Sequence, residues 1–229
     1  MKRSKRYKKA QKNIDHLKTY NLDEALETVV KNATAKFDEG VEVHLALGIN
    51  PRQSDQLVRG SIIFPHGIGK SKKVAVFAEG DKAKEAKEAG ADLVGGQELI
   101  DKIKQKKVCD FEVAVATSEM MKNLAPIAKI LGPKGLMPSP KTETVTTEIA
   151  KTVGELKKGK ISFKNDDGGN LHQLIGKVSL GKDKLKENLS AFLNKVQGMK
   201  PENSKGVFIK NIVICSSMGP GIGVKSSQS

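Results

Sequence analysis

Tryptophan is absent from this 229-residue chain, and aromatic residues make up only 4% of it. Proteins that bind single-stranded nucleic acid by base stacking use aromatic side chains interleaved along a cationic groove. The composition therefore argues against a stacking platform of this kind.

Long apolar runs and clustered cysteines are also missing. No apolar run approaches the ~18 residues of a membrane span, and no apolar block follows the basic N-terminus as in a secretory signal. Cys109 and Cys215 are the only cysteines, and neither stands in a CxxC pair. We therefore expect a reduced cytoplasmic protein with no membrane partner and no disulfide framework.

The sequence also lacks the residue patterns that catalytic sites require. Gly69–Ser71 resembles the end of a phosphate-binding loop, but Phe64 occupies the position of the required first glycine, and the strand-like "KKVAVF" follows instead of a helix. The four histidines have no metal-ligand spacing, and Asp166 belongs to "NDDGG", a turn sequence. We predict no enzyme, no metal and no cofactor.

Positive charge is abundant. The chain carries 40 Lys and Arg against 26 Asp and Glu, a net charge of +14, which favours a polyanionic partner, nucleic acid first. The first twelve residues, "MKRSKRYKKAQK", hold seven positive charges and no acid. This segment is either a frayed, solvated tail or an arm that lies on phosphates.

Hydrophobic periodicity changes twice along the chain. A helix with an apolar stripe running to Phe37 is expected from about Asn21, followed by strands at 41–47 and 56–64. Residues 72–159 alternate short strands and helices, as parallel βαβ units do, with Pro126 interrupting one helix. After 160, strands on either side of "DDGG" predict a hairpin, then a helix at 182–197 and a last strand at 206–215.

These patterns predict α/β and α+β architecture in two domains. Residues 1–66 plus 160–229 form a discontinuous, sandwich-like α+β domain with an antiparallel sheet, and 67–159 form an inserted, Rossmann-like parallel α/β domain. The two crossings predict a double hinge. Its residues are Pro65, His66, Gly67, Gly159 and Lys160. The split domain carries a net +10 and the insert +4, so we expect the polyanion to bind the split domain.

With few aromatics, a folded RNA recognised by shape and backbone is the expected partner. The candidate RNA contacts are polar residues on or beside the predicted strands, with one aromatic residue, one methionine and one glycine. They are Lys36, Phe37, Glu42, Lys164, Asn165, His172, Ser216, Ser217, Met218 and Gly219. For Phe37 the alternative is packing in the core stripe, and for Met218 it is burial at a chain end.

Five blocks of the sequence resemble one known family. They are "FDEGVEVHLALGINPRQSDQLVRGSIIFPHGIGK", "EAGADLVGG", "ILGPKGLMPSPK", "FKNDDGGNLHQLIGK" and "SSMGPG", and in this order they are similar to the bacterial large-subunit ribosomal protein L-one family. The resemblance implies the split architecture and RNA contacts at Lys36, Phe37, Glu42 and Ser217–Gly219. One departure is that Cys215–Ser217 stands where the family usually has threonines.

The resemblance also implies partners and a role. Family members bind folded 23S rRNA, form the mobile stalk next to the E site of the large ribosomal subunit and help to release deacylated tRNA. Many repress their own operon mRNA. We expect a monomer when the protein is free.

Three questions stay open at this stage. The segment 130–141 either reverses the chain, with Leu136 and Met137 tucked beneath it, or contacts RNA through Lys134 and Lys141. An enzyme that uses a phosphorylated ligand in the inserted domain is the alternative class of protein. A free translational repressor is compatible with ribosomal RNA binding and differs in the RNA that is occupied.

Overall fold

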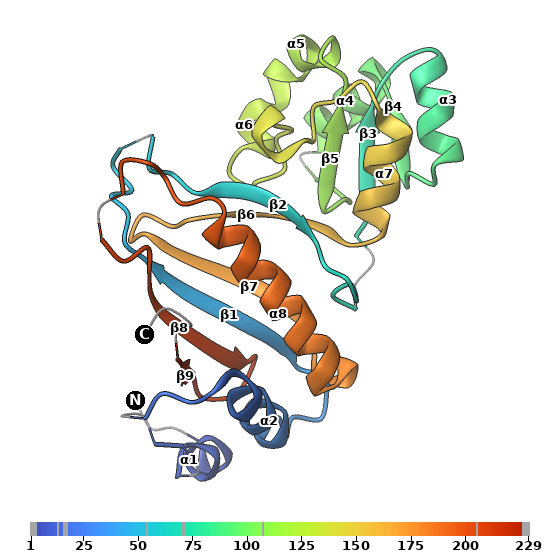
Figure 1. Ribbon diagram of the computed structural model, residues 1–229. Helices are drawn as coiled ribbons and strands as arrows, with labels where there is room; N and C mark the ends of the chain where they lie inside the picture. The colour runs from blue at the N-terminus through green and yellow to red at the C-terminus, as the bar shows by residue number, and fades with distance from the viewer. Residues whose placement is uncertain are drawn as a thin grey trace. The chain divides into compact units, whose positions relative to one another are not determined.

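The computed structural model describes residues 4–12, 14–15, 18–53, 55–69, 72–106, 108–204 and 206–225 (Figure 1). The chain divides into two compact units, the first formed by Met1–Gly69 and Phe163–Ser229, the second by Lys70–Ser162. No helix in the described part of the chain is long and apolar enough to cross a bilayer.

The first unit combines antiparallel strands with helices. Its elements are α1 (Lys5–Lys12), α2 (Leu22–Asn32), β1 (Gly40–Leu47), β2 (Arg59–Ile63), β6 (Lys160–Lys164, which crosses the division), β7 (Asn170–Lys177), η3 (Val178–Leu180), α8 (Lys182–Gln197), β8 (Ile209–Ser216) and β9 (Ile222–Val224).

The main sheet of the first unit has the order β7-β1-β8-β9, with antiparallel neighbours throughout. Alternate residues of β1 are buried, beginning with Val41, Val43 and Leu45. Helices α2 and α8 contact each other as well as the sheet (Figure 1). The pleat turns the intervening residues of β1 to the other face, which carries the polar side chains.

Helix α2 is shorter than its apolar stripe suggested. It begins after Asn21, which forms a capping box with Glu24, and it ends at Asn32 because Ala33 is extended. The stripe therefore stops before Phe37, which is 56% exposed. The alternative that Phe37 packs in the core is wrong.

The predicted hairpin around "DDGG" is also wrong. The turn itself forms, since the N–H of Asp166 donates to the carbonyl of Asn170 at 2.8 Å. However, β6 pairs with β2 in a separate two-stranded sheet, whereas β7 joins β1. The Asn165 side chain accepts from the N–H of Val58 at 3.0 Å, which draws the chain before the turn toward the β2 side.

The second unit alternates strands and helices, as its pattern predicted. Its elements are β3 (Val74–Phe77), α3 (Asp81–Glu88), β4 (Leu93–Gly95), α4 (Gln97–Lys106), β5 (Val113–Ala116), α5 (Met120–Leu124), η1 (Ala125–Ile127), α6 (Ala128–Leu131), η2 (Pro140–Thr142) and α7 (Ile149–Lys157). Pro126 lies in η1, a 3-10 turn between α5 and α6.

The sheet of the second unit is parallel, with the order β4-β3-β5. Val74 and Val76 of β3 face a core that includes residues of α3 and α7. Ala75 and Phe77 face the opposite core, to which α4, α5 and α6 contribute. The predicted fold class, an antiparallel α+β part with a parallel α/β insert, is confirmed.

The segment after α6 reverses the chain. Gly135 has a φ of +68°, which glycine adopts without steric cost, and the N–H of Leu136 donates to the carbonyl of Leu131 at 3.0 Å. Leu136 and Met137 pack against the core, as the structural interpretation of this segment predicted. Gly132 is the C-cap residue of α6 and keeps a helical conformation, and the reversal follows at Gly135.

Candidate nucleic-acid interface

Two backbone segments meet at one end of the main sheet around the carboxylate of Glu39. The N–H of Ala35 donates to Oε1 at 2.9 Å, and the N–H of Met218 donates to Oε2 at 3.1 Å. Arg6 of α1 lies 3.9 Å from the same carboxylate. A single side chain thus joins loop 33–39, the turn after β8 and the N-terminal helix. We call these residues, 33–39 and 216–219, the Glu39 cluster.

The charge of Glu39 is held inside the protein, since the residue is only 2% exposed. Burial by itself raises the pKa of this carboxyl, but the hydrogen bonds from Ser216, Ala35 and Met218, with the charge of Arg6, outweigh burial and lower the pKa. Glu39 is therefore ionised at neutral pH and orders both segments.

Gly40 fixes the approach of the two segments. Its N–H lies 3.1 Å from Ser217 Oγ, and its carbonyl accepts from the N–H of Ser217 at 2.9 Å. A Cβ at Gly40 would meet Leu174 Cδ1 at 2.7 Å. A larger residue at this position would have to displace the Leu174 side chain.

The cluster presents apolar and cationic groups to solvent. Phe37 and Met218 are 56% and 51% exposed, and Lys36 is exposed beside Phe37. The alternative that Met218 is buried is therefore wrong. Ser216 is buried, and its hydroxyl serves Glu39, so within the cluster it has a positioning function.

The open face of the sheet continues from the cluster. Glu42 pairs with Cys215 on β8, and His44 pairs with His172 on β7. The two imidazole Nδ1 atoms are 2.8 Å apart, so one nitrogen donates a hydrogen bond and the other accepts it. The two rings therefore cannot both be positively charged. Burial, then the neighbouring His172, lowers the pKa of His44, against an opposing effect of Glu42.

Cys215 lies beside this pair, with its Sγ 3.2 Å from His44 Nε2. Burial raises the pKa of the Cys215 thiol to about 11, and Glu42 adds to the effect. The thiol is neutral at physiological pH and is a poor nucleophile.

The turn before β7 carries the next candidates. The backbone N–H of Asn170, its side-chain amide and further donors lower the pKa of Asp166 to about 2, which fixes this carboxylate as an anion. Lys164 is exposed. Asn165 is buried, and its amide donates to the carbonyl of Asp166 at 2.8 Å. An RNA contact at Asn165 stays a prediction, and in the structure its side chain orders the turn.

The candidate hinge residues are tied within their own units. Asn188 of α8 accepts from the N–H of His66 at 3.2 Å and donates to the carbonyl of Gly67 at 2.9 Å. Lys160 is buried and bonds Glu143 and Glu155 of the second unit. Burial lowers the pKa of Lys160, but the two carboxylates outweigh burial and raise it. Motion about these residues stays a prediction.

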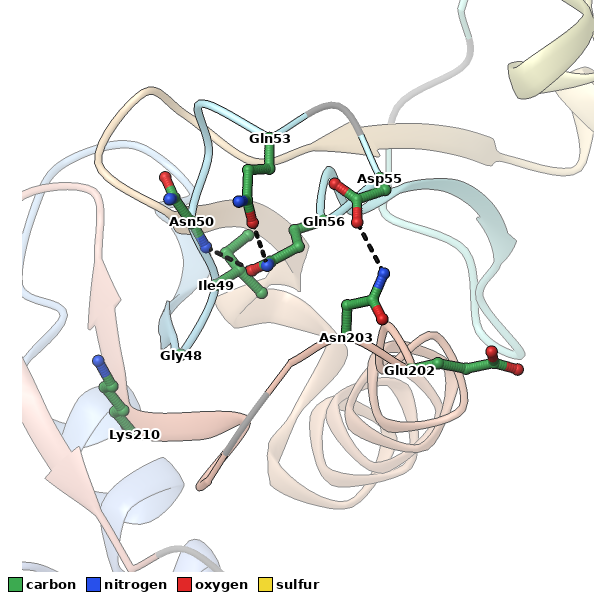
Figure 2. A pocket seen from close by; sticks show the side chains of 9 residues that line it. All are labelled: Gly48, Ile49, Asn50, Gln53, Asp55, Gln56, Glu202, Asn203 and Lys210. Carbon is green, nitrogen blue, oxygen red and sulfur yellow. Dashed lines mark hydrogen bonds between the residues drawn. The ribbon is translucent and has the colours of Figure 1, made fainter.

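A hollow of the first unit, about 700 Å³ in volume, lies between loop 48–56 and the segment after α8 (Figure 2). Most of its polar groups bond one another: Asn203 donates to Asp55 at 2.9 Å, and the N–H of Asn50 donates to Gln56 at 2.8 Å. Polar groups that are already paired offer little to a ligand, so we interpret this hollow as a junction of loops.

Glu39 and Gly40 were missed as site residues by the sequence analysis. Both lie in "KFDEG", where an acid and a glycine between a helix and a strand look like ordinary turn residues. Only the fold reveals that Glu39 is buried and bonded to a segment some 180 positions later.

An open polar sheet face with exposed apolar groups beside cations defines a binding protein. Among the residues that the structure describes, no three potential ligands gather as a metal site. The segment after Gly69 leads to strand β3 and not to a phosphate-binding helix.

Comparison with known proteins specifies the class further. A model of the Ribosomal protein L1p/L10e family matches residues 29–220. The chain is 52% identical over 221 residues to the large ribosomal subunit protein uL1 of Fervidobacterium nodosum, covering 96% of this chain and 94% of that protein. It is 52% identical to the protein of that name from Kosmotoga olearia, with 96% and 95% covered, and 46% identical to that from Solibacter usitatus, with 99% and 95% covered.

The chain belongs to the ribosomal protein L1p/L10e family. The family consists of structural ribosomal proteins, so the alternative of an enzyme in the inserted domain is set aside.

Proposed function

We propose that this protein is a structural constituent of the large ribosomal subunit in the cytoplasm, and that its split domain, residues 1–66 plus 160–229, binds folded 23S rRNA. The relatives that carry the name large ribosomal subunit protein uL1 support the location. The net charge of +14 supports an RNA partner.

The Glu39 cluster is the observation that carries the proposal. It holds two large apolar side chains, Phe37 and Met218, in solvent beside Lys36. Exposed apolar groups next to free cations suit the sugar edges and phosphates of an RNA minor groove. The open face with Glu42 and His172 extends the same surface, and Lys164 is exposed at the end of β6, before the turn that leads into β7.

The remaining parts of the proposal follow from the family resemblance. The protein, monomeric when free, forms the mobile stalk next to the E site and helps deacylated tRNA to leave, with motion at Pro65–Gly67 and Gly159–Lys160. It represses its own operon when an mRNA folds like the rRNA site, because a surface that reads shape accepts either RNA.

Binding of a 23S rRNA transcript to the full chain tests the RNA proposal. We expect tight binding that weakens steeply with salt, because bound lysines release counterions. Met218→Asp places a negative charge on the proposed interface and should weaken binding at least about tenfold, roughly 1.4 kcal/mol. Filter binding at several salt concentrations measures both effects.

Val207→Asp is the matched control, since Val207 is also an exposed apolar residue of the first unit, at 60%. It should bind RNA like the wild type. Equal affinities of the two variants, or an affinity of the wild type that does not change with salt, would contradict the proposal.

A further inference from the structure

A cavity of about 540 Å³ lies between helix α1 and the C-terminal end of α2. Its lining comes from both helices and from the start of loop 33–39. The lining residues are Arg6, Lys9, Ala10, Lys31, Asn32 and Thr34. Three of these six side chains are cationic, and none is acidic.

The acids of α2 do not neutralise this cavity. Asp23 bonds Lys186 at 2.7 Å, and Glu27 bonds Lys182 at 3.2 Å, so both are directed to α8. The third acid, Glu24, accepts from the N–H of Asn21 at the start of α2. Of the three cations, Arg6 shares the charge of Glu39 at 3.9 Å. Among the described residues, neither Lys9 nor Lys31 has an ion-pair partner.

Asn32 adds an independent sign of a ligand. Its Nδ2 atom is buried, and within the described part of the chain it has no hydrogen-bond partner. A buried donor without an acceptor costs about 1–3 kcal/mol. Solvent in the cavity does not reach Nδ2, so the Asn32 amide has to rotate toward the cavity to donate to an acceptor oxygen there, and this rotation would remove the cost. The hydroxyl of Thr34, an exposed residue, offers a second donor.

The cavity adjoins the Glu39 cluster through one covalent link and one ionic link. Thr34 precedes Ala35, whose N–H donates to Glu39. Arg6 lines the cavity and also lies 3.9 Å from Glu39, which in turn accepts from the N–H of Met218. An RNA strand on the cluster therefore passes close to the cavity.

We propose that this cavity is a binding site for a backbone phosphate of the RNA that occupies the Glu39 cluster. Lys9, Lys31 and Arg6 supply the charge, and Asn32 and Thr34 donate hydrogen bonds to the phosphate oxygens. Helix α1 is then an arm that lies on RNA and not a solvated tail. The inference rests on the proposed RNA-binding function and assigns a further contact to it.

The test is Asn32→Asp in the full chain, which keeps the side-chain shape and puts a negative charge in the cavity. The matched control is Asn194→Asp, because Asn194 is an exposed residue in the last turn of α8, as Asn32 is at the end of α2. Both changes alter the net charge equally, and both place an acid at the unfavourable end of a helix.

With a 23S rRNA transcript as the probe, Asn32→Asp should weaken binding at least about tenfold relative to Asn194→Asp. A second pair separates folding from binding. The double variant Lys9→Gln, Lys31→Gln should reduce the salt slope of log K by about 0.7–0.9, which corresponds to one phosphate contact. The control double variant Lys102→Gln, Lys104→Gln, at exposed positions of α4 in the second unit, should leave the slope as it is.

The outcomes separate the two proposals. If the wild type binds and both members of each pair behave alike, the cavity is not a phosphate site and the proposed function stands. If the wild type does not bind 23S rRNA, the proposed function itself is wrong, and the phosphate site falls with it.

Discussion

Glu39 shows how one side chain organises a recognition surface that it does not itself present. The carboxylate is buried and accepts hydrogen bonds from two backbone segments and one serine. Both exposed apolar residues of the cluster, Phe37 and Met218, lie within these segments. Their orientation therefore depends on a charge that solvent does not reach.

Glu39→Gln tests this dependence. The amide has one acceptor oxygen where the carboxylate has two, so one backbone N–H loses its partner and the amide donors face another N–H. We expect a loss of about 2 kcal/mol of unfolding free energy and weaker RNA binding. Chemical denaturation of the variant and the wild type at pH 7 measures the first effect.

The pH dependence of this loss has a definite sign. Because folding lowers the pKa of Glu39 from its ordinary value of 4.5, its contribution is present above about pH 4.5 and disappears as the pH falls through the lower folded value. The difference between variant and wild type should therefore shrink in acid. Glu88→Gln, at an exposed site of α3, should show no such loss at pH 7, and an equal loss there would contradict the assignment.

At the scale of elements, the sequence patterns predicted the individual helices and strands better than they predicted which strands pair. The alternation in "VEVHLALGIN" was sufficient for β1, and the apolar stripe was sufficient for the start of α2 near Asn21. The partners of β2 and β6 were not predictable, because strand pairing depends on contacts far apart in sequence, such as Asn165 with Val58. The Glu39 cluster was out of reach for the same reason.

Asn188 joins helix α8 to strand β7 and to the segment that follows β2. It is fully buried, and its amide donates to the carbonyls of Ile175 at 2.8 Å and Gly67 at 2.9 Å while its oxygen accepts from the N–H of His66 at 3.2 Å. The segment that follows β2 is thereby held on α8. In the sequence, Asn188 is one polar residue within an amphipathic helix.

Asn188→Leu should destabilise the protein although leucine is a better helix former. Three backbone groups would lose their partners, and we expect a loss of about 3 kcal/mol. Urea denaturation of the full chain measures it. The control Asn194→Leu, at an exposed position of the same helix, should change stability by less than about 0.5 kcal/mol, and similar losses at both positions would refute the function assigned to Asn188.

At the scale of the whole molecule, most of the net positive charge lies outside the insert, whereas the second unit has hydrophobic cores of its own. The insert 67–159 carries 17 lysines and 13 acids, a net +4, against +10 for the rest of the chain. The core clusters of the second unit are nevertheless built from its own residues, between Val74 and Leu156. A unit with its own core and little net charge can be removed without removing the surface that we assign to RNA.

A shortened chain, residues 1–69 joined by a glycine–serine linker to 160–229, tests this separation. It keeps β6 whole, so that the β2–β6 pairing is retained. We expect cooperative unfolding and an affinity for 23S rRNA within about tenfold of the full chain, roughly 1.4 kcal/mol, with a similar salt slope because the bound phosphates are the same. If the shortened chain folds but does not bind 23S rRNA at low ionic strength, the RNA surface lies elsewhere. The cluster around Glu39 would then be a structural junction like the hollow of Figure 2.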